Sequence, residues 1–180
     1  MKGMTKVENV AFQSSEQKLS EQEILDFEKS LGVKLPISFV EHYKIFNGGF
    51  PNANWSKGTD LVIPLRHFFS IKYGEDTIER KIRELKNVED LKELLPFAIN
   101  KIKGYFCIGT GKDNYGGIYH YEKLPDVPDK KACFDVDEIE RHCADFSEFI
   151  SNLYVDKFYG KVFKPVLGWV EDFEAYTKNW

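Results

Sequence analysis

The chain has 180 residues, of which 42% are hydrophobic, 30% are charged and 15% are aromatic. These proportions are typical of a single globular domain with its own core and exclude an intrinsically disordered chain. The net charge of −4 disfavours a nucleic-acid partner, which needs a concentrated positive surface, and favours a basic protein as partner.

The first predicted element is a helix over residues 21–31. Ser20 is a favourable N-cap residue, and Glu23 stands where it can complete a capping box. Gly32 can adopt the left-handed conformation that commonly ends a helix. Between these signals, apolar residues recur at helical spacing and define a buried side, namely Ile24, Phe27 and Leu31.

A second helix is predicted to begin at Pro36, because proline suits the first helical position, where its missing N–H would have no partner. Three residues stop it, Asn47, Gly48 and Gly49, since asparagine and glycine favour turns. The inward side of this helix is predicted to carry Val40, Tyr43 and Phe46.

In the middle of the chain, the sequence predicts a loop, then a strand and then a helix. Residues 50–59 are rich in turn-forming types and predict an exposed loop that carries Trp55. Residues 61–71 predict extended chain, with Pro64 confining its first part to a sheet edge or a bend. Helical spacing returns over residues 78–94 and predicts one long or broken helix.

The C-terminal half begins with a predicted β-hairpin. Residues 105–109 and 117–122 are β-prone runs, and the turn between them is rich in glycine. Residues 132–143 predict a half-exposed strand, because β-branched and aromatic residues occur there among charged ones, with a helix over the second half as the alternative.

Two further helices are predicted near the C-terminus. Asp145 and Glu148 resemble a capping box, and they open a short helix with a buried side made by Phe149, Ile150 and Leu153. A last helix is predicted after Pro165, with apolar residues available for docking, namely Trp169, Val170, Phe173 and Tyr176.

The opening helix pair resembles that of the SUKH superfamily, named for immunity proteins and a fungal regulator of cell-wall assembly. The resemblance rests on the spacing of Glu28, Leu31, Gly32, Leu35, Pro36, Tyr43, Phe46, Asn47, Gly48 and Gly49. Weaker matches follow in the same order at residues 95–98, 116–117 and 144–150. The resemblance covers about residues 19–155 of one predicted domain, 1–180, and leaves 156–180 as a C-terminal extension.

The resemblance implies an α+β fold with helices packed on a curved, mostly antiparallel sheet. Many bacterial members are immunity proteins that bind and neutralise a secreted polymorphic toxin, frequently a nuclease. It implies no catalytic residues and no cofactor, and gives a structural role to Leu35, Pro36, Tyr43, Phe46, Asn47, Gly48 and Gly49. We therefore expect a non-enzymatic immunity protein with a basic toxin as partner. The alternative is a regulatory scaffold for an endogenous partner, as the fungal branch suggests.

Two acidic runs are candidate contacts for a basic partner, although a solvated surface is the default interpretation of each. The first spans residues 16–28, and the second, at 135–140, is denser in negative charge. We favour the second run, with Asp137, Glu138 and Glu140, because opposite charge steers association. Trp55 is a further candidate as an aromatic anchor, with burial against the core as the alternative.

The remaining chemical signals are weak. Cys107 and His120 lie on adjacent predicted strands and leave a small cysteine hydrolase as a third hypothesis, with two ordinary sheet residues as the alternative. His142 and Cys143 are adjacent on a strand, so we expect them to face opposite sides and not to share a metal ion. The three cysteines, Cys133 included, lack zinc-ribbon spacing and are expected to be reduced.

The expected location is the cytoplasm, without a membrane partner. The first 18 residues lack the apolar stretch of a signal peptide. No run approaches the roughly 18 apolar residues that a membrane span needs.

Overall fold

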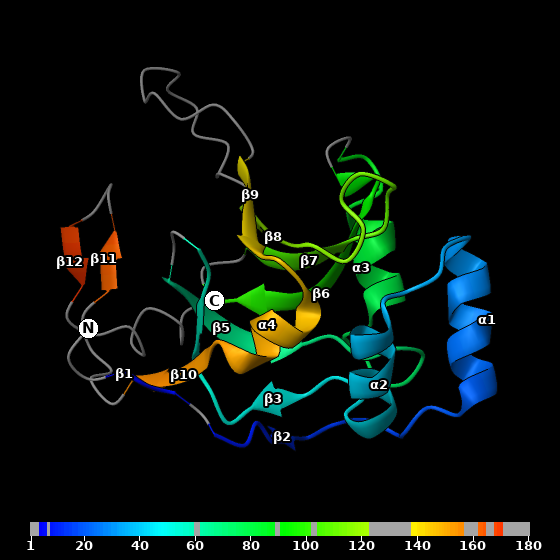
Figure 1. Ribbon diagram of the computed structural model, residues 1–180, viewed down its shortest axis with the longest axis horizontal. Coiled ribbons are helices and arrows are strands. Elements are labelled where there is room, and N and C mark those ends of the chain that lie inside the picture. Colours follow the sequence, from blue (N-terminus) through cyan, green and yellow to red (C-terminus); the bar gives the residue numbers. More distant parts are fainter. Residues whose placement is uncertain are drawn as a thin grey trace.

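The computed structural model describes most of the chain, namely residues 4–6, 8–59, 62–88, 91–101, 104–122 and 138–156, with the backbone of 162–164 and 168–170. These residues form four helices and a curled antiparallel sheet, a half-barrel (Figure 1), so the predicted α+β class is confirmed.

The helices are α1 (Glu21–Leu31), α2 (Ile37–Ile45), α3 (Ile78–Glu84) and α4 (Phe146–Ser151). The predicted limits of α1 are confirmed: Ser20 and Glu23 form a capping box, and Gly32 closes the helix with a φ of 70°. The helix α2 begins one residue later than predicted. With a ψ of 140°, Pro36 lies outside the helix and serves as its N-cap, since its carbonyl accepts from the N–H of Phe39 and of Val40.

The main sheet has eight strands in the order β1-β10-β4-β5-β6-β7-β8-β9, and each paired strand runs antiparallel to its neighbour. Its strands are β1 (Met4–Lys6), β4 (Trp55–Lys57), β5 (Val62–Phe68), β6 (Leu94–Asn100), β7 (Tyr105–Gly109), β8 (Ile118–Glu122), β9 (Glu138–Cys143) and β10 (Leu153–Asp156). Two smaller pairs join β2 (Phe12–Gln13) to β3 (Phe50–Pro51), and β11 (Val162–Lys164) to β12 (Gly168–Val170).

The helices α2 and α4 lie over the inner side of the half-barrel (Figure 1). Between them and the sheet lies a core rich in aromatic residues. Phe97 of β6 lies 5.3 Å from Phe149 of α4 between ring centroids, and Phe39 of α2 lies 5.1 Å from Phe146. On the outer side, a second apolar cluster forms where β6, β7 and β8 meet the segment after α3, and it buries Leu91, Leu94, Cys107 and Tyr121. Burial of both sheet faces explains the continuous apolar run of β6.

Two predicted elements were wrong in the middle of the chain. The helix predicted over residues 78–94 ends at Glu84, and Leu94 already belongs to β6, because a short apolar run fits a buried strand as well as a helix. Pro96 is accommodated inside β6 by a register shift against β7. The loop predicted at 50–59 contains β4, so Trp55 lies in the main sheet.

The hairpin of β7 and β8 is confirmed, and so is the start of α4 at its N-cap Asp145. Leu153 opens β10 and does not extend α4. The helix predicted after Pro165 is wrong at Trp169 and Val170, which lie in β12. Phe173 and Tyr176 lie outside the described residues.

Candidate partner-binding surface

The end of α2 is anchored to the sheet by a buried asparagine. The side-chain Oδ1 of Asn47 accepts a hydrogen bond from the backbone N–H of Ile71 at 2.7 Å. Its Nδ2 donates to the carbonyls of Gln17 at 2.9 Å and of Ile71 at 3.0 Å. Because three backbone groups depend on this one amide, Asn47 joins the N-terminal segment, α2 and the segment after β5.

Two glycines follow at positive φ, where the chain passes close to other backbone. A Cβ at Gly48, with a φ of 71°, would lie 2.8 Å from the backbone nitrogen of Ser70. A Cβ at Gly49, with a φ of 103°, would lie 2.6 Å from the carbonyl oxygen of Gln13. These separations are below van der Waals contact, so the fold restricts both positions to glycine.

The remaining residues of the helix-pair motif also make packing contacts. The N–H of Leu35 donates to Glu28 at 2.8 Å, and the Tyr43 hydroxyl donates to the carbonyl of Phe69 at 2.9 Å. Burial alone would raise the pKa of Glu28, but hydrogen bonds from Lys34 and from Leu35 outweigh it and lower that pKa. Phe46 is half-buried and its ring lies against Phe12 and His42.

The half-barrel is joined across its opening by a seam between β4 and β9. The hydroxyl of Ser56 lies 2.8 Å from Nε2 of His142, although 86 residues separate them in sequence. The carbonyl of His142 also accepts from the N–H of Thr59 at 2.9 Å. Since four strands stand between β4 and β9 in the sheet order, only strong curling of the sheet can bring these two strands together.

A second buried histidine lies inside the half-barrel. The Nε2 of His120 is 2.9 Å from the side-chain nitrogen of Asn100, whose oxygen accepts from the N–H of Gly104 at 2.6 Å. Burial lowers the pKa of His120 and of His142 to about 4, so both rings are neutral at pH 7. Both are almost inaccessible, at 6% and 2% exposure, and they serve the interior of the protein.

The nucleophile and base of the hydrolase hypothesis are not brought together. The register of β7 and β8 places Cys107 opposite Tyr119 and Phe106 opposite His120. Directly opposed residues share a face of the sheet, so Cys107 and His120 face opposite sides. Burial also raises the pKa of the Cys107 thiol, which disfavours the nucleophilic thiolate.

The prediction that His142 and Cys143 face opposite sides was wrong. A register shift between β8 and β9 adds a residue to β9 at this point, and a bulge of this kind breaks the alternation. The Cys143 side chain lies in the main core, and the His142 ring packs on Phe106 and Phe149 of the same core. Among the described residues, no three metal-ligating side chains are close enough to hold an ion.

Three of the predicted partner-binding residues lie on two strands on either side of the seam, namely Trp55 on β4 and Glu138 and Glu140 on β9. Trp55 is half-buried in β4, opposite Pro64 of β5 and Tyr154 of β10. Glu140 is exposed on β9. The backbone of Glu138 pairs with Glu122, but its side chain, like the whole of Asp137, lies outside what the structure describes.

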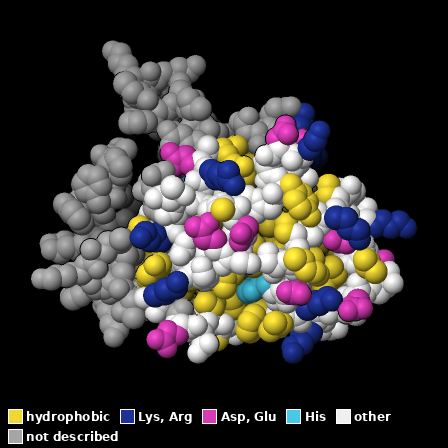
Figure 2. Space-filling model, in the orientation of Figure 1, with side chains coloured by type: hydrophobic (Ala, Val, Ile, Leu, Met, Phe, Trp, Pro, Cys, Tyr) yellow, Lys and Arg dark blue, Asp and Glu magenta, His cyan; other side chains and the backbone are white. Residues whose placement is uncertain are grey.

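The sequence interpretation missed an exposed apolar face on the helix pair. Large hydrophobic side chains are exposed at Leu25 (48%) on α1, at Ile37 (70%) and Ile45 (56%) on α2, and at Tyr115 (52%) in the β7–β8 turn. Figure 2 shows hydrophobic side chains gathered over this turn and over α2. A detectable signal existed: Ile37, Glu41 and Ile45 recur every four residues, on the side of α2 away from Phe39 and Tyr43.

The described residues form a helix pair packed on a half-barrel, which defines an α+β protein. Within them, Cys107 and His120 lie on opposite faces of the sheet and do not form a catalytic pair. The model of the SMI1/KNR4 family (SUKH-1) matches residues 18–152, and the chain belongs to this family. This agrees with the SUKH resemblance at the helix pair. SMI1/KNR4 is not a known enzyme family. No curated protein matches the chain, and none of the described helices is long and apolar enough to cross a membrane.

Proposed function

We propose that this protein is a cytoplasmic immunity protein that binds a basic toxin, such as a nuclease, and holds it inactive. The exposed apolar side chains on the helix pair carry the proposal, because contiguous apolar surface on a soluble domain is typical of protein-binding sites. Membership of the SUKH-1 family is consistent with an immunity or regulatory role.

Neutralisation would need shape and charge complementarity and no chemical step. The net charge of −4 attracts a basic partner at long range. A bound acidic protein would also compete with the nucleic acid that such a toxin would otherwise engage. In this mechanism Glu140 and its neighbours Asp137 and Glu138 contribute to the approach of the toxin, and Trp55 is a candidate contact.

The direct test is to purify the protein with the product of the adjacent gene, in a catalytically inactive form. We expect a stable complex and, with the active form, complete inhibition of its activity at equimolar ratio. If the adjacent product does not bind and the captured partner is a housekeeping protein, the regulatory-scaffold alternative holds instead.

Association kinetics test the electrostatic part of the proposal. Replacing Asp137, Glu138 and Glu140 with the corresponding amides should slow association in stopped-flow measurements, because steering depends on opposite charge. Added salt should slow the parent protein too, since the Debye length falls from about 10 Å at 0.1 M to about 3 Å at 1 M. An association rate that changes neither with the amide substitutions nor with added salt would mean that this acidic run is only a solvated surface.

A further inference from the structure

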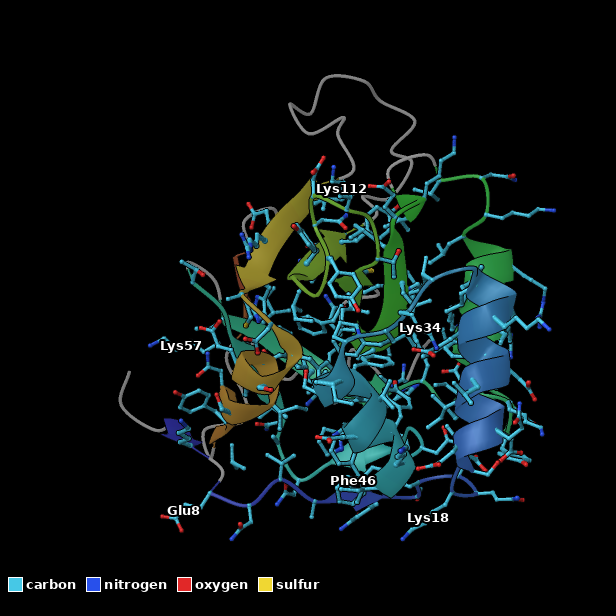
Figure 3. The ribbon with its side chains drawn as sticks, turned by 45° about the vertical axis from the view of Figure 1, so that its right-hand side comes forward. Glu8, Lys18, Lys34, Phe46, Lys57 and Lys112 are labelled. Atoms are coloured by element: carbon cyan, nitrogen blue, oxygen red, sulfur yellow. The ribbon has the colours of Figure 1, made fainter. Side chains whose placement is uncertain are left out.

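Five large hydrophobic side chains are exposed among the described residues, and four of them lie on α1, on α2 or in the β7–β8 turn that contacts the start of α2. We call this surface the helix-pair face and define it by Leu25, Ile37, Glu41, Ile45 and Tyr115. Figure 3 marks its two ends with Lys112, in the turn between β7 and β8, and Phe46, at the end of α2.

Contacts between neighbouring residues show that the face is continuous. A Cβ at Gly116 would lie 3.5 Å from Cγ of Pro36, so the turn that carries Tyr115 rests on the residue preceding Ile37. At the other end, Lys44 of α2 bonds Glu21 of α1 at 3.1 Å. Glu21 is one helical turn from Leu25, and Lys44 precedes Ile45.

The start of α2 is not arranged for helix stability in water. Its N-cap Pro36 makes no side-chain hydrogen bond, and no acidic residue lies in its first turn. An exposed Ile37 occupies a position where Asp or Glu would interact favourably with the helix dipole. By contrast, α1 has a full capping box with Glu21 and Glu23 in its first turn. An aliphatic residue at 70% exposure is therefore explained better by a partner than by the helix.

The charges of the face favour one kind of occupant. The two lysines that flank the exposed side of α2 are paired within the chain, since Lys34 bonds Glu28 at 2.6 Å and Lys44 bonds Glu21, whereas Lys112 at one end of the face has no ion pair among the described residues. Glu41 is exposed between Ile37 and Ile45 and has no ion-pair partner within the described part of the chain. Along α2, the face thus combines an apolar strip with one carboxylate that has no ion-pair partner among the described residues.

We infer that the helix-pair face is the contact surface for the protein partner, and that the partner presents apolar side chains together with a Lys or Arg that pairs with Glu41. This inference rests on the proposed function and names its binding surface. The two surfaces then affect different rate constants. The acidic residues near the seam affect the association rate of a basic partner, and the helix-pair face determines its dissociation rate.

The test measures dissociation of the inactive product of the adjacent gene from immobilised variants. Ile37→Ser combined with Ile45→Ser, and separately Glu41→Lys, should each accelerate dissociation at least about tenfold, because central apolar anchors and desolvated charges dominate interface energetics. Glu8→Lys makes the same charge change at an exposed residue of the N-terminal segment, away from the helix pair (Figure 3), and is the matched control, with dissociation at the parental rate. Unchanged melting curves for all variants would show that the fold is intact.

The outcomes separate this inference from the proposed function. If the parent protein binds and the variants on the helix-pair face dissociate at the parental rate, or if Glu8→Lys accelerates dissociation as much as Glu41→Lys does, the inference is wrong and the immunity role stands. If the parent does not bind the adjacent product, the proposed function fails, and the inference fails with it. Sedimentation tests a second copy as the occupant: a parental dimer that Ile37→Ser and Ile45→Ser convert to monomers would overturn the inference.

Discussion

Comparing Gly48 with Gly32 separates two energetic costs of adding a side chain. One is the clash with nearby backbone at the end of α2, and the other is the strain of a left-handed backbone conformation. Both adopt nearly the same positive φ, 71° and 70°, but a Cβ at Gly48 would meet the backbone of Ser70 at 2.8 Å, whereas one at Gly32 would meet nothing within 4 Å. Changing each glycine to alanine therefore adds the same methyl group at the same backbone conformation in two different surroundings.

The left-handed conformation should cost each alanine variant about 1–2 kcal/mol. Alanine also lowers the conformational entropy of the unfolded chain, which stabilises the folded state by about 0.4–1 kcal/mol in both variants. Only Gly48→Ala must also displace neighbouring backbone, at about 1–3 kcal/mol by analogy with overpacked cores. We thus expect Gly48→Ala to be the less stable variant by about 1–3 kcal/mol, a large part of a typical stability of about 5–15 kcal/mol.

Urea unfolding followed by circular dichroism gives both free energies of unfolding on one scale. Equal losses for the two variants would refute the reasoning, because they would show that no close approach exists at Gly48. The stronger change Gly48→Val should lower stability further. A Gly48→Val protein that melted like the parent yet lost its partner would instead place this glycine in the binding surface.

Three further results are expected. Asn47→Ala should lower the free energy of unfolding by about 3 kcal/mol or more, measured in urea, because it leaves buried backbone groups unpaired. The free energy of unfolding should fall as the pH drops from 6.5 towards 4, by about 3 kcal/mol each for His120 and His142, since only the unfolded chain then binds these protons. In thermal melts recorded over this pH range, His142→Gln should make the melting temperature depend less on pH. Cys107 and Cys143 should resist alkylation by iodoacetamide until urea is added, because burial shields both thiols and raises their pKa. Mass spectrometry measures this alkylation. Replacing the cysteines with Ala or Ser should leave partner binding unchanged.

Elements with local signals could be predicted from the sequence. The limits of α1 follow from Ser20, Glu23 and Gly32, whose cap chemistry acts within one turn of the helix ends. The β7–β8 hairpin follows in the same way from its glycine-rich turn. By contrast, the start of β6 at Leu94 depends on burial of both sheet faces, which periodicity along one segment does not reveal.

The candidate surface was harder to predict, because exposure is decided by distant packing. Ile37 and Ile24 are the same residue type, each near the start of a helix, yet one is 70% and the other 4% exposed. The side chains of His142 and Cys143 both point to the core because of a bulge in β9, and this bulge arises where β9 pairs with β8. Trp55 was assigned to a loop because its strand is short and surrounded by turn-forming residues.

The seam between β4 and β9 bears on how the chain reaches its native state. Ser56 and His142 are separated by 86 residues, and four strands stand between β4 and β9 in the sheet order. Contacts of such long sequence separation are formed against a larger loss of chain entropy, and sheets rich in them fold in milliseconds to seconds. The half-barrel also cannot close on the ribosome until β9 has emerged. Completion of the fold thus waits for the last third of the polypeptide, while the capped α1 can form as soon as it is synthesised.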